Sequence, residues 1–172
     1  MTTTTSPAEL GAGATNSSRR DTLRLVSIGL GTIGLLVTIY LVYTKITSTE
    51  QVCLGGDAFN CDLVQSSIYS KIGPVPIQYL GLLGYFAILL SLVLEPRLPL
   101  LKARGTIVVF GLTLFGFLYS MYLTSIEAFV IHAWCMWCLI SAIVMTVLFG
   151  VSAARLWKSI GGVSEEAIDD EE

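Results

Sequence analysis

The sequence predicts an all-α membrane protein, a four-transmembrane-helix bundle with an outer loop that carries a cysteine pair. Of the 172 residues, 53% are hydrophobic and only 13% are charged, whereas soluble domains carry about 25% charged residues. Mean hydropathy is +0.73. Four long stretches contain no charged residue, and the four cysteines lie between them or at their ends. This composition excludes disordered and nucleic-acid-binding proteins.

The first apolar stretch follows a polar N-terminal segment. Residues 1–18 consist mainly of Thr, Ser, Ala and Gly, and we expect them to form a disordered cytoplasmic N-terminus. The 20 residues from Leu25 to Thr44 contain no charge, and a helix of this length crosses a bilayer core. A secretory signal has a shorter apolar region and a small-residue cleavage site. We therefore predict a helix over about 25–46 that acts as a retained signal anchor.

Three further uncharged stretches predict the remaining helices. Pro74 and Pro76 precede the second helix, and proline suits the first helical turn because its missing N–H costs nothing there. With the first helix, these stretches form one membrane domain. The predicted boundaries are about 75–94, 105–127 and 134–156 for the helices and 19–158 for the domain.

Lysines and arginines near the helix ends predict the orientation, because cytoplasmic loops are enriched in these residues. The outer side would carry only Lys45 and Lys71. We therefore expect both termini to be cytoplasmic and all four cysteines to lie on the outer face. Residues 159–172 form an acidic C-terminal tail that we expect to be disordered. The residues on the cytoplasmic side would be Arg19, Arg20, Arg24, Arg97, Lys102, Arg104, Arg155 and Lys158.

Two cysteine pairs carry the chemistry. Cys135 and Cys138 form a Cys-x-x-Cys at a predicted helix start, where unpaired N–H groups and the helix dipole favour the reactive thiolate. Cys53 and Cys61 lie on the outer loop, on the oxidising side, where disulfides form. We infer an electron relay from an outside partner through the loop pair to the helix pair. The sequence shows no nucleotide fingerprint, iron–sulfur spacing or pair of haem histidines, so the natural acceptor is a lipid-soluble quinone, either ubiquinone or menaquinone.

Three segments carry a resemblance to a known family. Residues 53–69 read CLGGDAFNCDLVQSSIY, residues 73–85 read GPVPIQYLGLLGY, and residues 134–138 read WCMWC. This pattern of cysteines, serines and a Gly-x-x-Gly segment is similar to the bacterial form of the vitamin K epoxide reductase family. The resemblance covers about residues 20–158. It implies a quinone-linked thiol:disulfide oxidoreductase in a bacterial inner or cell membrane.

The resemblance also implies a role for each candidate site residue. Cys138 matches the cysteine that lies against the quinone and passes electrons to it. Cys135 matches the cysteine that exchanges with Cys61, and Cys53 matches the one that meets the external partner. Ser67 matches a serine whose hydroxyl hydrogen-bonds a quinone oxygen, and its alternative role is that of a helix cap or turn residue.

The sequence departs from vertebrate members of the family at two positions. Ala142 stands where they have a tyrosine, and the segment 76–78 lacks their asparagine. Because those groups are associated with vitamin K handling, the resemblance favours quinone reduction coupled to disulfide formation over epoxide reduction. Many bacterial relatives carry a fused thioredoxin-like domain after the fourth helix. This chain ends there, so we expect its partner to be a separate thioredoxin-like disulfide-forming protein.

Two residues and one function class have alternative interpretations. His132 either stabilises a nearby thiolate or lies in a short interfacial loop. Glu127 either marks the membrane surface or handles protons beside the quinone. The alternative function is a non-catalytic tetraspan membrane protein with a structural zinc or disulfide site. We expect no metal, because the seven residues between Cys53 and Cys61 exceed the usual two to four between paired zinc ligands.

Overall fold

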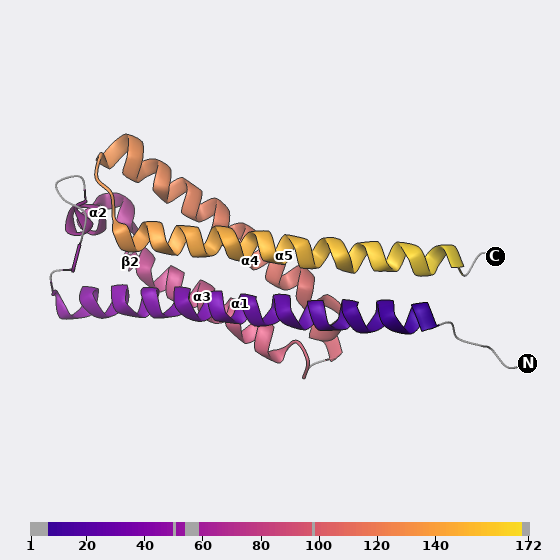
Figure 1. The fold of residues 1–172 in the computed structure, drawn as a ribbon. Helices are drawn as coiled ribbons and strands as arrows, with labels where there is room; N and C mark the ends of the chain where they lie inside the picture. The colour runs from indigo at the N-terminus through magenta and orange to yellow at the C-terminus, as the bar shows by residue number, and fades with distance from the viewer. Residues whose placement is uncertain (1–6, 50, 54–58, 98, 170–172) are drawn as a thin grey trace, which may run out of the picture.

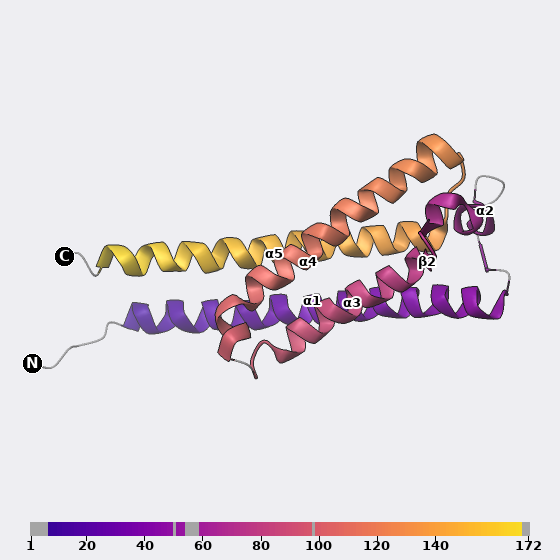
Figure 2. The same cartoon turned by 180° about the vertical axis from the view of Figure 1, so that it is seen from behind.

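Four long helices form the molecule, and each runs antiparallel to the next along the chain (Figure 1). The structure is a computed structural model that describes residues 7–49, 51–53, 59–97 and 99–169. Helix α1 packs on α3 and α5, and α4 packs on α5 and α3. The view from behind shows both termini at one end and the short elements at the other (Figure 2). The long helices are α1 (Pro7–Thr47), α3 (Ile77–Leu94), α4 (Pro99–Ile126) and α5 (Met136–Asp169).

Short elements fill the end of the bundle opposite the termini. A two-stranded hairpin turns at Gly73, whose φ of +61° favours a residue without a Cβ, and it leads directly into α3. Pro76 ends the hairpin and stands at the N-cap position of α3. The short elements are α2 (Cys61–Ser66), the 3₁₀ turn η1 (Ile68–Ser70), β1 (Lys71–Ile72), β2 (Val75–Pro76) and the π-helix η2 (Glu127–Ile131).

The predicted fold class is confirmed: within the described ranges, four helices are long and apolar enough to span a membrane. The third span extends beyond its predicted end at residue 127. It continues through the π-helix, past Glu127, because the apolar run resumes after this residue. The spans cover Thr22–Thr47, Ile77–Leu94, Arg104–Ile131 and Met136–Ile160.

The structure also differs from the predicted boundaries at both ends of the chain. We expected disorder over 1–18 and 159–172, but α1 begins at Pro7 and α5 continues to Asp169. Extending a helix is inexpensive once a long span has nucleated it, because each further residue adds a backbone hydrogen bond. Residues 1–6 and 170–172 lie outside the described residues.

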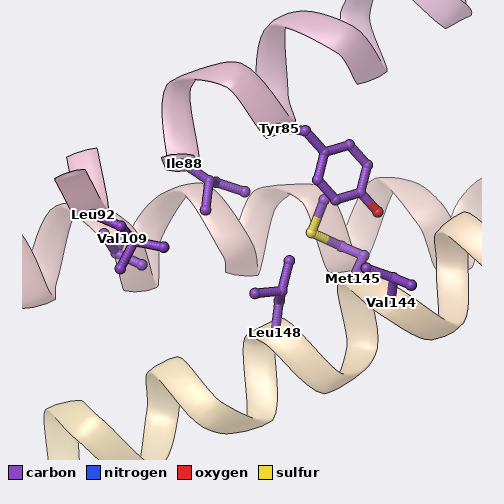
Figure 3. Close-up of a cluster of buried hydrophobic side chains, with 7 residues drawn as sticks. All are labelled: Tyr85, Ile88, Leu92, Val109, Val144, Met145 and Leu148. Carbon is purple, nitrogen blue, oxygen red and sulfur yellow. The ribbon is translucent and has the colours of Figure 1, made fainter. Parts of the chain in front are cut away.

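A buried apolar cluster joins α3, α4 and α5 in the middle of the bundle (Figure 3). Tyr85 lies at the edge of this cluster nearest the cysteines, and its hydroxyl donates a 2.9 Å hydrogen bond to the Ser141 carbonyl. Its ring lies against Gly34 of α1, where a Cβ would overlap the ring atoms. Gly34 therefore permits the close approach of α1 and α3. The cluster consists of Tyr85, Ile88, Leu92, Val109, Val144, Met145 and Leu148.

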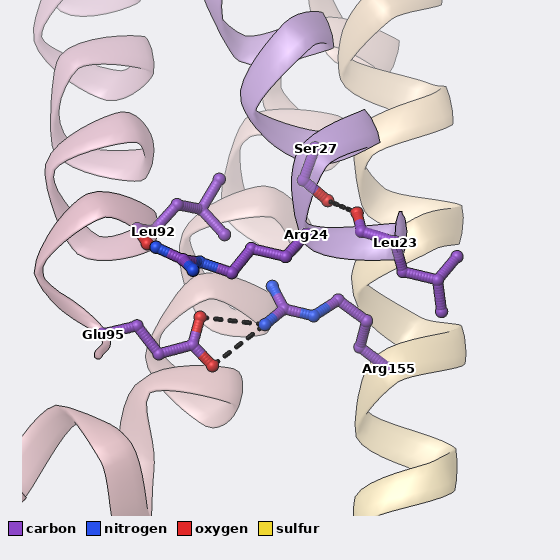
Figure 4. Close-up of polar contacts among 6 residues, drawn as sticks. All are labelled: Leu23, Arg24, Ser27, Leu92, Glu95 and Arg155. Atoms are coloured by element: carbon purple, nitrogen blue, oxygen red, sulfur yellow. Dashed lines mark hydrogen bonds and ion pairs between the residues drawn. The ribbon is translucent and has the colours of Figure 1, made fainter. Parts of the chain in front are cut away.

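Charged side chains join the helices around the C-terminal end of α3 (Figure 4). The Arg155 guanidinium of α5 donates through Nη2 to both carboxylate oxygens of Glu95, at 2.9 and 2.8 Å. Arg24 of α1 donates through Nε to the Leu92 carbonyl at 3.1 Å. These contacts fix the relative position of α1, α3 and α5 and leave the opposite end for the cysteines.

Candidate redox site

The Cys-x-x-Cys lies at the start of α5, as its position in the sequence predicts. Cys135 precedes the first helical residue, and its carbonyl accepts the Leu139 N–H at 3.0 Å. The backbone N–H of Cys138 donates to Cys135 Sγ at 3.4 Å. Both cysteines are free thiols, and Cys135 is fully buried. The first turn of α5 therefore holds the two sulfurs together and offers an N–H group to Cys135.

The loop pair forms a disulfide between Cys53 and Cys61. Asn60 fixes the second of these cysteines, because its Oδ1 accepts the Leu63 N–H at 2.9 Å and so caps α2. Gly55 and Gly56, between the two cysteines, lie outside the described residues. Cys53 is half-buried and Cys61 is buried, so Cys53 is the more accessible of the pair.

The two pairs meet in one buried cluster. Cys61 and Cys135 form its centre with Val64 and Ala133, and Cys53 and Cys138 pack against it. Backbone contacts set this arrangement: residues 59 and 134 form a parallel β-bridge, and the Asn60 N–H donates to the Trp134 carbonyl at 3.1 Å. All four cysteines therefore lie together at one end of the bundle.

The Cys135 thiol lies in an environment that favours its thiolate. A hydrogen bond with the Cys138 side chain lowers the pKa of Cys135 below its ordinary value, although burial and the charge of Glu127 act in the opposite direction. The backbone N–H of Cys138 and the Gln65 amide also lower this pKa, the amide lying 3.9 Å from Sγ. The surroundings of Cys135 therefore favour the reactive, thiolate form of this cysteine.

Glu127 occupies a position that neither sequence interpretation fully describes. It is the first residue of the π-helix and is 4% exposed, so its side chain is enclosed by the protein. Its Oε2 accepts the Cys135 N–H at 3.1 Å. His132 ends the π-helix in a left-handed conformation with φ 55°, and it is exposed. The structure thus places His132 in the short connection and turns Glu127 inward.

A chain of buried amides leads away from Cys135. Gln65 donates through Nε2 to Gln51 Oε1 at 2.8 Å, and Gln78 Nε2 donates to Gln65 Oε1 at 2.7 Å. The Gln78 side-chain oxygen is buried and has no hydrogen-bond partner among the described residues. The sequence analysis missed the role of Gln65. Its signal was a polar residue inside the serine-containing segment next to Cys61, but only the fold brings Gln78 beside it.

A cavity of about 170 Å³ lies between the short elements and the four long helices. Its wall is mainly apolar, and Cys138 belongs to it. Ser67 also lines the cavity, and its hydroxyl donates to the Val64 carbonyl at 2.7 Å. Ser67 is the C-cap residue of α2, so its backbone has the helix-cap position that the sequence offered as an alternative. Its side chain borders the cavity. The other polar groups of the wall include Gln78 and Glu127.

The fold and the site together define the class of this protein, a multi-pass membrane protein with a thiol–disulfide site. Its long helices are apolar enough to span a membrane, and its two cysteine pairs lie beside an apolar cavity. The chain matches the model of the Vitamin K epoxide reductase family over residues 25–153, most of its length. It therefore belongs to this family, as the resemblance indicated. Membership makes it, in general terms, a quinone-linked thiol oxidoreductase of the membrane.

Proposed function

We propose that this protein oxidises an extracytoplasmic thioredoxin-like partner, passes two electrons to a quinone and so supports disulfide bond formation. The observation that carries the proposal is that one cluster gathers all four cysteines beside an apolar cavity. Cys53 is half-buried, Cys61 and Cys135 form the buried centre of the cluster, and Cys138 lies on the cavity wall.

The proposed electron path consists of balanced exchange steps. The partner dithiol reduces the Cys53–Cys61 disulfide and leaves as a disulfide. Cys61 then transfers its reducing equivalents to the Cys135–Cys138 disulfide by thiol–disulfide exchange. In the last step two S–H bonds of Cys135 and Cys138 break and one S–S bond forms. Two electrons and two protons leave the pair for the quinone, which becomes a hydroquinone.

The cavity fits the ring of a quinone in its chemistry. Its wall is mainly apolar, as an uncharged ring requires, and the few polar groups converge on it. The unpartnered Gln78 oxygen is an acceptor that suits a hydroquinone hydroxyl. The Ser67 hydroxyl would turn from the Val64 carbonyl to donate its proton to a quinone oxygen. A bound quinone would accept the two electrons. Cys138 is the sulfur that borders it, and Ser67 and Gln78 orient it.

The proposed orientation follows from charge. Arg24 and Arg155 contact Leu92 and Glu95 at the C-terminal end of α3. Lys45 lies in the last turn of α1 and Lys71 in β1, both at the cysteine end. With the arginine-rich end in the cytoplasm, the cysteines face the outer, oxidising side of a bacterial inner or cell membrane.

Anaerobic turnover by the purified protein tests the proposal. A small dithiol serves as donor, ubiquinone or menaquinone as acceptor, and ultraviolet absorbance follows quinone reduction. We expect turnover in the wild type and none in Cys138→Ala. We also expect Cys53→Ala to lose oxidation of a thioredoxin-like partner.

Folded wild type without turnover would contradict the proposal. Stoichiometric zinc in that protein would then support the alternative, a tetraspan protein with a structural metal site. Among the described residues, no group of three or more His, Cys, Asp and Glu side chains is placed to hold a metal ion.

A further inference from the structure

Glu127 is a buried carboxyl that the electron path above does not use. It lies within the span Arg104–Ile131 and is 4% exposed. An ionisable side chain inside a membrane span is costly, and such residues usually serve a function. The cavity that holds Cys138 also borders Glu127. The question is what a carboxyl does at this place.

The carboxyl lies beside both members of the Cys-x-x-Cys. Its Oε2 accepts the backbone N–H of Cys135 at 3.1 Å. Its side chain is close enough to the Cys138 side chain for the two to interact. Both side chains line the same cavity.

The local backbone is built to hold the side chain there. Glu127 begins a π-helix, a form that is rare and often marks functional sites. The π-helix ends at His132, where the left-handed conformation turns the chain back toward Ala133 and Cys135. This detour brings a residue eight positions before Cys135 into contact with the same helix start.

Oxidation of the cysteine pair leaves two protons to place. Cys135 sits where its thiolate is favoured and can give its proton to water, so the proton of the Cys138 thiol is the one that needs an acceptor at this site. A carboxylate beside the thiol can accept this proton. The proton is then needed in the cavity, where the oxygen of the quinone would lie.

We propose that Glu127 is the catalytic proton carrier of this site. Its carboxylate takes the proton as the Cys138 S–H bond breaks. The electron pair left on the Cys138 sulfur passes to the quinone as the Cys135 thiolate forms the S–S bond with that sulfur, and the second proton of the hydroquinone comes from water. The resulting carboxylic acid then releases the proton to the quinone oxygen and returns to the carboxylate. The inference rests on the proposed function.

Glu127→Gln separates this role from a structural one. The amide still accepts the Cys135 N–H but cannot carry the proton. We expect kcat for quinone reduction to fall about 100-fold, in line with the contribution of a general acid–base group. The KM for quinone should change less than about two-fold, and Glu127→Asp should recover part of kcat. Glu95→Gln makes the same change at the other end of the bundle and should leave kcat unchanged.

A second readout needs no quinone. Infrared difference spectra between the dithiol and disulfide states of the purified protein should contain a carboxyl band, because oxidation removes the thiol that Glu127 contacts. This band should be absent in Glu127→Gln and present in Glu95→Gln.

The outcomes separate the two proposals. Wild type without quinone reduction refutes the proposed function and this inference with it. An active wild type with equal kcat in a folded Glu127→Gln refutes only the role of Glu127. An unchanged kcat with a raised KM, or the lack of a Glu127-dependent band, also overturns that role. If Glu127→Gln fails to fold, Glu127→Asp and the infrared band of the wild type decide the question.

Discussion

The Asn60 N–H donates a 3.1 Å hydrogen bond to the Trp134 carbonyl, and each of these residues immediately precedes a cysteine. Because of this contact, Cys61 at the start of α2 and Cys135 at the start of α5 share one buried cluster. Two segments more than seventy positions apart thus form a single site, and the account of electron transfer depends on this relationship.

A double variant tests the contact between the pairs. Cys53→Ala with Cys138→Ala leaves Cys61 and Cys135 as the two cysteines of the chain. We expect mild oxidation to join them within one molecule, because both lie in the same buried cluster. Peptide mapping without reduction measures the link. If Cys61 and Cys135 can both still be alkylated after the oxidised protein is unfolded, no disulfide has formed between them. This result would contradict their placement in one cluster.

Ser67→Ala tests the polar group on the cavity wall. Loss of one hydrogen bond costs about 1 kcal/mol, so we expect the KM for quinone to rise roughly five-fold. Ser66→Ala is the matched control, because Ser66 makes a similar backbone hydrogen bond but is exposed and does not line the cavity. Equal KM values in the two variants would remove Ser67 from the binding site.

The titration of Cys135 tests the cause of its low pKa. We compare two variants that keep Cys135 as the sole cysteine: Cys53→Ala and Cys61→Ala combined with either Cys138→Ser or Cys138→Ala. A serine hydroxyl can still hydrogen-bond the thiolate, and alanine cannot. Thiolate absorbance against pH should therefore give a lower pKa in the serine variant.

The sign of the linked stability follows from the lowered pKa. The thiolate interactions stabilise the fold above the pKa of the unfolded thiol, and this stabilisation is lost as pH falls through the folded-state pKa. The serine variant should therefore gain more stability than the alanine variant as pH rises. Identical titration and pH dependence in the two variants would contradict the role of the Cys138 hydrogen bond.

Gly34→Ala tests the packing of α1 against α3. A Cβ at this position overlaps the Tyr85 ring, and such overpacking costs about 1–3 kcal/mol, so we expect a lower midpoint of thermal unfolding in detergent. Gly29→Ala in the same helix meets no atom within 4 Å and should keep or raise the midpoint. A Gly34→Ala midpoint equal to that of Gly29→Ala would show that the helices do not approach as described.

Local patterns in the sequence predict the spans and the place of both cysteine pairs. Uncharged stretches define membrane helices, and the two-residue spacing places Cys135 and Cys138 in one helical turn. The inward position of Glu127 escaped this reasoning because it depends on a π-helix. Its signal was the apolar run that resumes at residue 128, which shows that the span continues beyond the carboxyl.

The amide chain could not be predicted from local patterns. Gln51, Gln65 and Gln78 come from the outer loop, α2 and α3, and only the packing of these elements joins them. The ends of α1 and α5 are also longer than expected. The polar composition of these ends predicts disorder, but adding residues to a helix that has already formed costs little free energy.

The most direct measurement follows a single turnover. Fully reduced protein is mixed anaerobically with an excess of quinone in the absence of any other donor, and protein disulfides are mapped after acid quenching. The account predicts hydroquinone formation together with a Cys135–Cys138 disulfide, and neither product in Cys138→Ala. Quinone that stays oxidised beside a folded, fully reduced wild type, or equal hydroquinone formation by Cys138→Ala, would contradict it.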